Sequence, residues 1–194
     1  MRIGKVRMRR ETKSMQNIKR MCVCSMLDPD EVLHRSTLVM QVYRDVVWMT
    51  TRRAKMMREN ILEFSFGKSL DTALAYLFEF APNERRQEFE ARVSSMFETK
   101  WLVDLIDNAM MRVYNYPDKG KLYFGILSKG YMSAFKYSEI ELLEEYHLER
   151  SAFYDRKREA LMLLGVSLWG FAIPEIKEIF EDFENKAEGQ FALY

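Results

Sequence analysis

The sequence predicts an all-α protein in which a helical bundle is followed by a helix-turn-helix and a C-terminal amphipathic helix. Only 8 Gly and 4 Pro interrupt the 194 residues, and apolar residues recur at helical spacing along most of the chain. A hydrophobic content of 48% with 30% charged residues is typical of a globular protein rather than a disordered one. We expect a basic, flexible arm (1–26), an N-terminal helical region (27–116), a helix-turn-helix domain (117–170) and a C-terminal amphipathic helix with a tail (171–194).

The arm is strongly basic. Residues 1–20 hold eight Lys or Arg against one Glu, a net charge of +7, so a whole-chain charge of +1 leaves −6 for the remainder. The arm lacks the continuous apolar core of a secretory signal. Such an arm can neutralise phosphates or enter a minor groove. The alternative is a flexible tail, or sequence upstream of a true start at Met21 or Met26.

The two cysteines give no sign of a disulfide or a metal site. Cys22 and Cys24 are spaced too tightly for an ordinary disulfide. Together with the distant His34 and His147 they make a poor zinc set. We therefore expect a reduced, cytoplasmic protein with no metal and no cofactor.

The N-terminal region begins with a clear helix start. Asp28 is a capping residue, Pro29 suits the first helical position, and acidic residues follow in the first turn. The segment Asn115–Gly120 is the clearest turn in the chain and marks the expected domain boundary. Between these points the spacing predicts helices at about 29–60, 70–80 and 83–100, and residues 101–114 either continue the last of these or begin a new helix.

Two short amphipathic helices follow this turn. Ser138 can cap the first, with Glu141 completing a capping box. The second is expected from about Glu149 to Leu164. Apolar residues of both helices would be buried at their crossing: Leu142, Leu143, Tyr146, Leu148, Phe153, Ala160 and Leu164.

The outward stripe of the second helix carries side chains that can reach base edges in a major groove. The residues expected to contact bases are Arg150, Ser151, Tyr154, Asp155 and Arg158. Those expected to contact phosphates are Lys129, Lys136, Ser138, Arg156 and Lys157. Residues 149–164 have a net charge of only +1, so the electrostatic footprint is small.

Residues 120–164 resemble region four of bacterial sigma factors. The run Ser151-Ala152-Phe153-Tyr154, with Lys157 and Glu159-Ala160, resembles the phage-borne ArpU-type transcriptional regulators of Gram-positive bacteria. The resemblance implies a regulator encoded by a phage or mobile element, and contact with RNA polymerase. His147 stands where the family commonly places Gly, and Glu149 where Ser or Thr is usual. His is a tolerated residue at positive φ, whereas Glu149 would repel phosphate.

The segment after the motif is acidic. Gly165 and Gly170 are expected to interrupt the helix, and Pro174 to open another with an apolar stripe at Ile176, Ile179, Phe180 and Phe183. Residues 171–194 have a net charge of −4. This helix would dock on the bundle or pair with a second copy, and we expect a homodimer.

Together these patterns predict a sequence-specific, double-stranded DNA-binding transcriptional regulator. The alternatives are a helical protein-interaction module without DNA binding, and a phage DNA-packaging protein of the small-terminase type. An enzyme is not expected, because the chain has no phosphate-binding Gly-rich loop and no hydrolase or metalloprotease motif. No apolar run of the sequence approaches the roughly 20 residues needed to cross a membrane.

Overall fold

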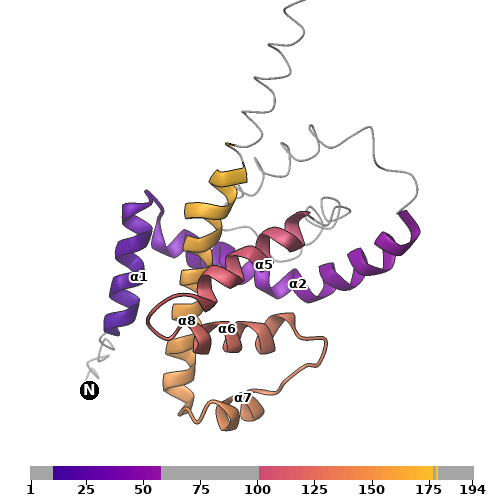
Figure 1. The fold of residues 1–194 in the computed structure, drawn as a ribbon. Coiled ribbons are helices and arrows are strands. Elements are labelled where there is room, and N and C mark those ends of the chain that lie inside the picture. The colour runs from indigo at the N-terminus through magenta and orange to yellow at the C-terminus, as the bar shows by residue number, and fades with distance from the viewer. Residues whose placement is uncertain (1–10, 58–100, 177, 179–194) are drawn as a thin grey trace, which may run out of the picture.

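The computed structural model of this protein describes residues 11–57, 101–176 and 178. This part is 81% helical and contains no strand, which confirms the predicted all-α class. The elements, in chain order, are α1 (Lys13–Cys24), α2 (Pro29–Met57), α5 (Trp101–Tyr114), α6 (Gly120–Leu127), the π-helical turn η1 (Ser128–Met132), α7 (Glu139–Glu145), α8 (Arg150–Ser167) and the π-helical turn η2 (Leu168–Ala172) (Figure 1).

Helix α1 corrects the prediction of a flexible arm over residues 1–26. Within that range residues 13–24 form a helix whose Met15, Ile18 and Cys22 are buried in the main core. Their spacing of three and four residues places them on one face of the helix. Thr12 caps the helix by accepting a hydrogen bond from the Met15 amide at 3.1 Å. The high positive charge of this region concealed an amphipathic helix.

Two predicted boundaries are confirmed. Helix α2 begins at Pro29, and the Asp28 carboxylate accepts hydrogen bonds from the Asp30 and Glu31 amides at 2.9 Å. These bonds satisfy amides that have no partner within the helix. Helix α5 ends at Tyr114, α6 begins at Gly120, and the predicted turn lies between them.

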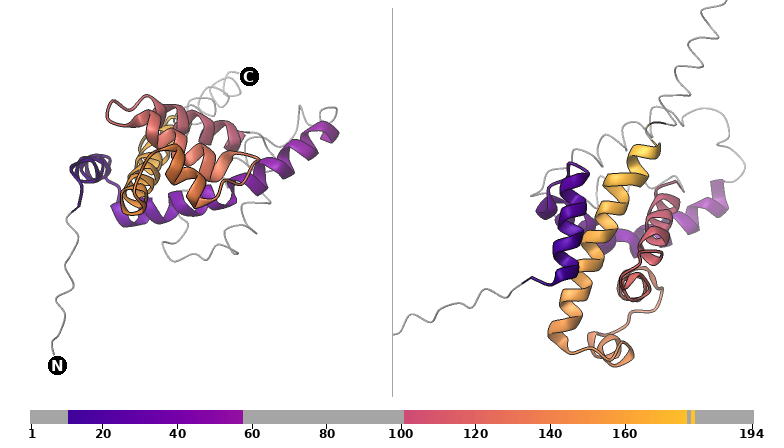
Figure 2. Two further views of the ribbon diagram at one scale, coloured as in Figure 1. Left: turned by 90° about the horizontal axis from the view of Figure 1, so that it is seen from below. Right: turned by 60° about the vertical axis from the view of Figure 1, so that its left-hand side comes forward.

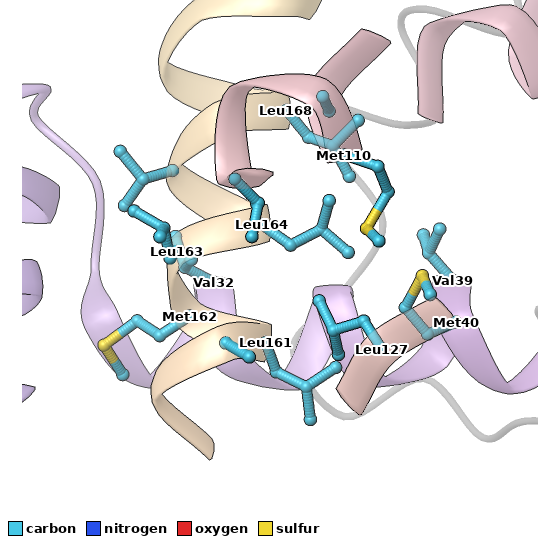
Figure 3. Close-up of a cluster of buried hydrophobic side chains, with 14 of the residues drawn as sticks. Val32, Val39, Met40, Met110, Leu127, Leu161, Met162, Leu163, Leu164 and Leu168 are labelled. Atoms are coloured by element: carbon cyan, nitrogen blue, oxygen red, sulfur yellow. The ribbon is translucent and has the colours of Figure 1, made fainter. Parts of the chain in front are cut away.

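Helix α8 lies at the centre of this arrangement. It contacts α1, α2, α5 and α6, which surround it in Figures 1 and 2. Met162 and Leu164 of α8 are completely buried. Figure 3 shows them in one cluster with Met40 of α2, Met110 of α5 and Leu127 of α6. The boundary predicted at residues 116 and 117 therefore falls inside a single hydrophobic core.

The predicted interruption at Gly165 is wrong, because α8 runs through it to Ser167. A Cβ atom at position 165 would lie 2.4 Å from Val32 Cγ1 and 2.3 Å from Ser36 Oγ of α2. Such distances are sterically forbidden, so the glycine permits close packing of the two helices. A glycine within a helical pattern can suggest a helix break, but here Gly165 marks the point where α8 crosses α2.

The chain also continues as helix beyond η2, so the expected new helix at Pro174 is not a separate element. The π-helical turn ends at Ala172, two residues before Pro174, whose ring nitrogen cannot donate a helical hydrogen bond. The helix Arg150–Ile176 is long and apolar enough to cross a membrane, with a mean hydropathy of 1.4 in one 18-residue window. However, 72% of that window is buried within the protein. The core helix of a soluble protein passes the same test of length and composition.

Some predictions fall outside the described residues. These are the basic residues before Glu11, the helices expected at 70–80 and 83–100, and the apolar stripe at Ile179, Phe180 and Phe183.

Candidate nucleic-acid interface

Helices α6, α7 and the first half of α8 share a small hydrophobic core of their own. Ile126 of α6, Leu142 of α7 and Phe153 of α8 are buried together. The partly buried residues packed around them are Leu122, Tyr137, Leu143, Tyr146 and Leu148. Five of the seven apolar positions that the sequence assigned to the crossing of α7 and α8 therefore pack there, whereas Ala160 and Leu164 are buried in the main core instead. The small core fixes α7 across the base of α8, as Figure 1 shows.

The start of α7 is the capping box predicted from the sequence. The Ser138 hydroxyl accepts a hydrogen bond from the Glu141 amide at 3.3 Å, and the Glu141 carboxylate accepts one from the Ser138 amide at 2.6 Å. The bond from the Ser138 amide, together with the nearby Ser138 hydroxyl, stabilises the Glu141 carboxylate and holds its pKa below the ordinary value. Ser138 and Glu141 are only three residues apart in the chain, so the capping box fixes the start of α7 independently of the rest of the fold.

Residues 146–149 join α7 to α8 through a left-handed position. His147 has a φ of 50°, as expected for the residue that occupies the turn. Tyr146, just before it, packs its ring against α6 at Gly125. A Cβ atom at position 125 would lie 2.5 Å from the Tyr146 hydroxyl oxygen, so a larger residue there would displace the tyrosine ring. The glycine therefore allows Tyr146 to pack closely on α6.

The first half of α8 presents most of the predicted base contacts to solvent. Arg150, Ser151, Tyr154 and Arg158 are exposed, and Asp155 is half-buried. Ser151, Asp155 and Arg158 lie on the side of the helix away from the buried Phe153, and Arg150 and Tyr154 lie at the edges of that face. An exposed row of hydrogen-bonding side chains on one helix face is the arrangement needed to read base edges in a major groove.

Two of these residues already have a partner, Glu139 at the start of α7. Arg150 Nε lies 2.7 Å from Glu139 Oε1, and the Tyr154 hydroxyl donates to Glu139 Oε2 at 2.8 Å. The bond from Tyr154 and the guanidinium of Arg150 hold the pKa of Glu139 below its ordinary value. The Arg150 side chain is 74% exposed, so the pair is a solvated one of small net stability. A DNA phosphate could replace Glu139 at little energetic cost.

The predicted phosphate contacts before α7 are spread along the chain. Lys129 of η1 pairs with Glu145 of α7, and this contact raises the pKa of the lysine. Lys136 is exposed in the loop between η1 and α7. The start of this loop is fixed by Arg44 of α2, whose Nε donates to the Ser133 carbonyl at 2.7 Å. Ser138 is exposed, but its hydroxyl oxygen already serves the capping box.

The last two predicted phosphate contacts differ from each other. The half-buried Lys157 places its ammonium 4.8 Å from the centre of the Tyr131 ring, a cation–π contact. Arg156 instead turns toward the interior. Its Nη1 lies 2.6 Å from Glu159 Oε2, and its side chain is only 16% exposed. The phosphate contact expected of Arg156 would require it to leave this partner.

Two glutamates form ion pairs at this surface that the sequence did not predict. Glu139 is paired with Arg150 across eleven residues, a spacing without a sequence signal. Glu159 is fully buried and lies three residues after Arg156. Side chains three residues apart on a helix commonly form ion pairs, so the pair could have been predicted from the sequence. The long apolar run that follows Glu159 could have indicated that this residue is buried.

Comparison with known proteins adds no family to this picture. No family model matches the sequence, and neither a curated protein nor a solved structure gives a match.

Proposed function

We propose that this protein is a sequence-specific, double-stranded DNA-binding transcriptional regulator that reads the major groove with the first half of α8. The exposed row of Arg150, Ser151, Tyr154 and Arg158 is the observation that carries this proposal. Helix α7 crosses the base of that row and would lie toward the DNA backbone, as the first helix of a helix-turn-helix does. The resemblance to sigma region four and to ArpU-type regulators supports the same role, carried by a phage or mobile element.

The charges of the surface set the expected affinity. Arg150 is paired with Glu139 and Lys129 with Glu145, so two cations of the face are partly neutralised before DNA arrives. Arg158, by contrast, is exposed and forms no ion pair within the described part of the chain. One copy would therefore bind weakly. We propose that the protein acts as a dimer on two half-sites about 34 to 36 Å apart, or beside RNA polymerase.

A specific observation favours a second candidate, a protein-interaction module that uses the same face. Ile140 of α7 is 67% exposed and Phe135 in the preceding loop is 60% exposed. Tyr154 of α8 is 47% exposed. Large apolar side chains at a surface commonly mark protein contacts. This candidate predicts binding that depends little on salt.

The test is a salt titration of duplex binding. We expect the logarithm of the affinity to fall linearly with the logarithm of salt concentration, with a slope of about −0.9 per phosphate neutralised. A double variant, Arg150→Gln with Arg158→Gln, should weaken binding to a duplex selected from a random pool. The matched control is Arg112→Gln, which removes a charge from α5, where Arg112 stacks on Phe171 of η2, beyond the buried end of α8. No binding, or an affinity independent of salt, would reject the DNA-binding function in favour of the interaction module.

A further inference from the structure

Glu159 is the most unusual side chain of the described fold. It is the one charged residue that is fully buried among the described residues, at 0% exposure. A buried carboxylate is strongly unfavourable unless it is paired and hydrogen-bonded. Glu159 meets this condition: Arg156 Nη1 lies 2.6 Å from Oε2, and the Tyr123 hydroxyl donates to the same oxygen at 2.8 Å. The Thr12 hydroxyl donates to the other oxygen, Oε1.

These partners come from separate elements. Tyr123 belongs to α6, Arg156 lies one turn earlier in α8, and Thr12 is the cap of α1. The positive end of the α1 dipole also faces this region, which favours a carboxylate there. Burial and the bond to Glu159 raise the pKa of Tyr123, so the tyrosine remains a proton donor. The carboxylate thus joins the start of α1, the middle of α6 and the recognition helix.

A second polar contact holds the same end of α1. The Ser14 hydroxyl donates to Asp118 Oδ2 at 2.9 Å, and Lys119 Nζ donates to Ser14 Oγ at 2.6 Å. Asp118 and Lys119 belong to the turn before α6, and both are exposed. Their contact is therefore screened by water, and the buried contact at Glu159 is the stronger restraint on α1.

We propose that Glu159 is a positioning residue that docks the start of α1 on the recognition helix and holds Arg156 away from the DNA. The first part of this inference concerns the fold alone. The second part rests on the proposed DNA-binding function. Under this inference Arg156 is not a phosphate contact, although its position in the sequence suggests one.

The docking of α1 can be measured through Cys22. This thiol lies on α1, is fully buried, and becomes the only thiol of the chain after Cys24→Ser. In that background we expect Glu159→Gln to speed alkylation of Cys22 by about ten- to a hundredfold, because a hydrogen bond to a charged group is lost. The control is Glu149→Gln, which makes the same chemical change at the exposed residue just before α8. It should leave the rate of Cys22 alkylation unchanged.

Variants of Thr12 test the same contact from the other side. Thr12→Asp keeps an acceptor for the α1 cap but loses the donor and adds a charge that faces Glu159. It should speed alkylation, whereas Thr12→Ser keeps the hydroxyl and should not. Local release of α1 predicts a rate that changes little with urea, unlike release through global unfolding. Two results would overturn the docking role. One is a Cys22 alkylation rate in both Glu159→Gln and Thr12→Asp that equals the rate of the parent protein. The other is a faster rate that is fully accounted for by a lower free energy of global unfolding.

The role of Arg156 is tested by the salt dependence of DNA binding. Arg156→Gln should leave the slope unchanged in the parent protein. Glu159→Gln should steepen the slope by about one unit, and adding Arg156→Gln should reverse that change. A slope reduced by about one unit in Arg156→Gln alone would show that Arg156 does contact phosphate. Absence of all binding would overturn the proposed function and this role of Arg156 together, while the thiol rates would still decide the docking of α1.

Discussion

The two halves of α8 are built on opposite plans although they belong to one uninterrupted helix. From Glu159 to Ser167 every residue is buried, so this half has no solvent face at all. From Arg150 to Arg158 only Phe153 is buried. The change happens within one turn, at the pair formed by Arg156 and Glu159.

The difference between the two halves shows how one helix can be held by its buried half while its exposed half remains free to change in sequence. A helix that is apolar on all sides is stable only inside a core, and here α1, α2, α5 and α6 provide that core. The exposed half takes its position from the buried half, so its outward side chains are not needed for folding. Substitutions in the two halves should therefore fall into separate classes, of stability and of binding.

The largest effect is expected in the buried half. Leu164→Ala would leave a cavity at a completely buried position and should lower the free energy of unfolding by about 2 to 5 kcal/mol. Urea denaturation followed by circular dichroism measures this loss. Ser151→Ala in the exposed half is the matched comparison and should change stability by less than about 0.5 kcal/mol. Similar losses from both changes would show that the two halves are not separate in function.

An intermediate effect is expected on DNA binding from the exposed half. Arg158→Ala should weaken binding to the preferred sequence by about 1 to 3 kcal/mol and relax the preference at one position. Lys157→Ala should weaken binding to all sequences alike, because a phosphate contact carries no sequence information. Competition binding with matched and mismatched duplexes distinguishes these patterns. If the two variants lose affinity equally on every sequence, the helix faces the groove through a different stripe.

The smallest effect is expected where the exposed half rests on α7. Ser138→Ala removes the capping oxygen and should lower the free energy of unfolding by about 0.5 to 2 kcal/mol. Glu141→Gln keeps the second half of the capping box and should cost less. The folded pKa of Glu141 is depressed, so its stabilising effect is present at neutral pH and is lost as the pH falls through that lower value. If Ser138→Ala lowered the free energy of unfolding by more than Leu164→Ala does, the buried half of α8 would not be the main source of stability.

The features that the sequence could predict are those set by residues close together in the chain. The capping box of α7 depends on Ser138 and Glu141 alone, and the start of α2 on Asp28 and Pro29. The inward positions of α8, including Phe153, follow from helical spacing and are buried. Local geometry was therefore sufficient for these elements.

The features that could not be predicted depend on contacts between distant residues. Thr12 and Glu159 are 147 positions apart, and no pattern in either segment announces their bond. Gly165 suggested a break because its partner on α2, Val32, was unknown. Helix α1 is the exception, because the helical spacing of Met15, Ile18 and Cys22 is present in the sequence. The positive charge around these residues favoured the interpretation as a flexible arm instead.

The continuity of α8 has a mechanical consequence. From Ser167 to Arg150 the helix rises about 1.5 Å per residue, so these ends lie about 25 Å apart. Without a hinge between them, a rotation of about 10° at the buried end would carry Arg150 through roughly 4 Å. That displacement is larger than a hydrogen-bond length. The helix is in this sense a lever, and small rearrangements around η2 would be enlarged at the surface proposed to read DNA.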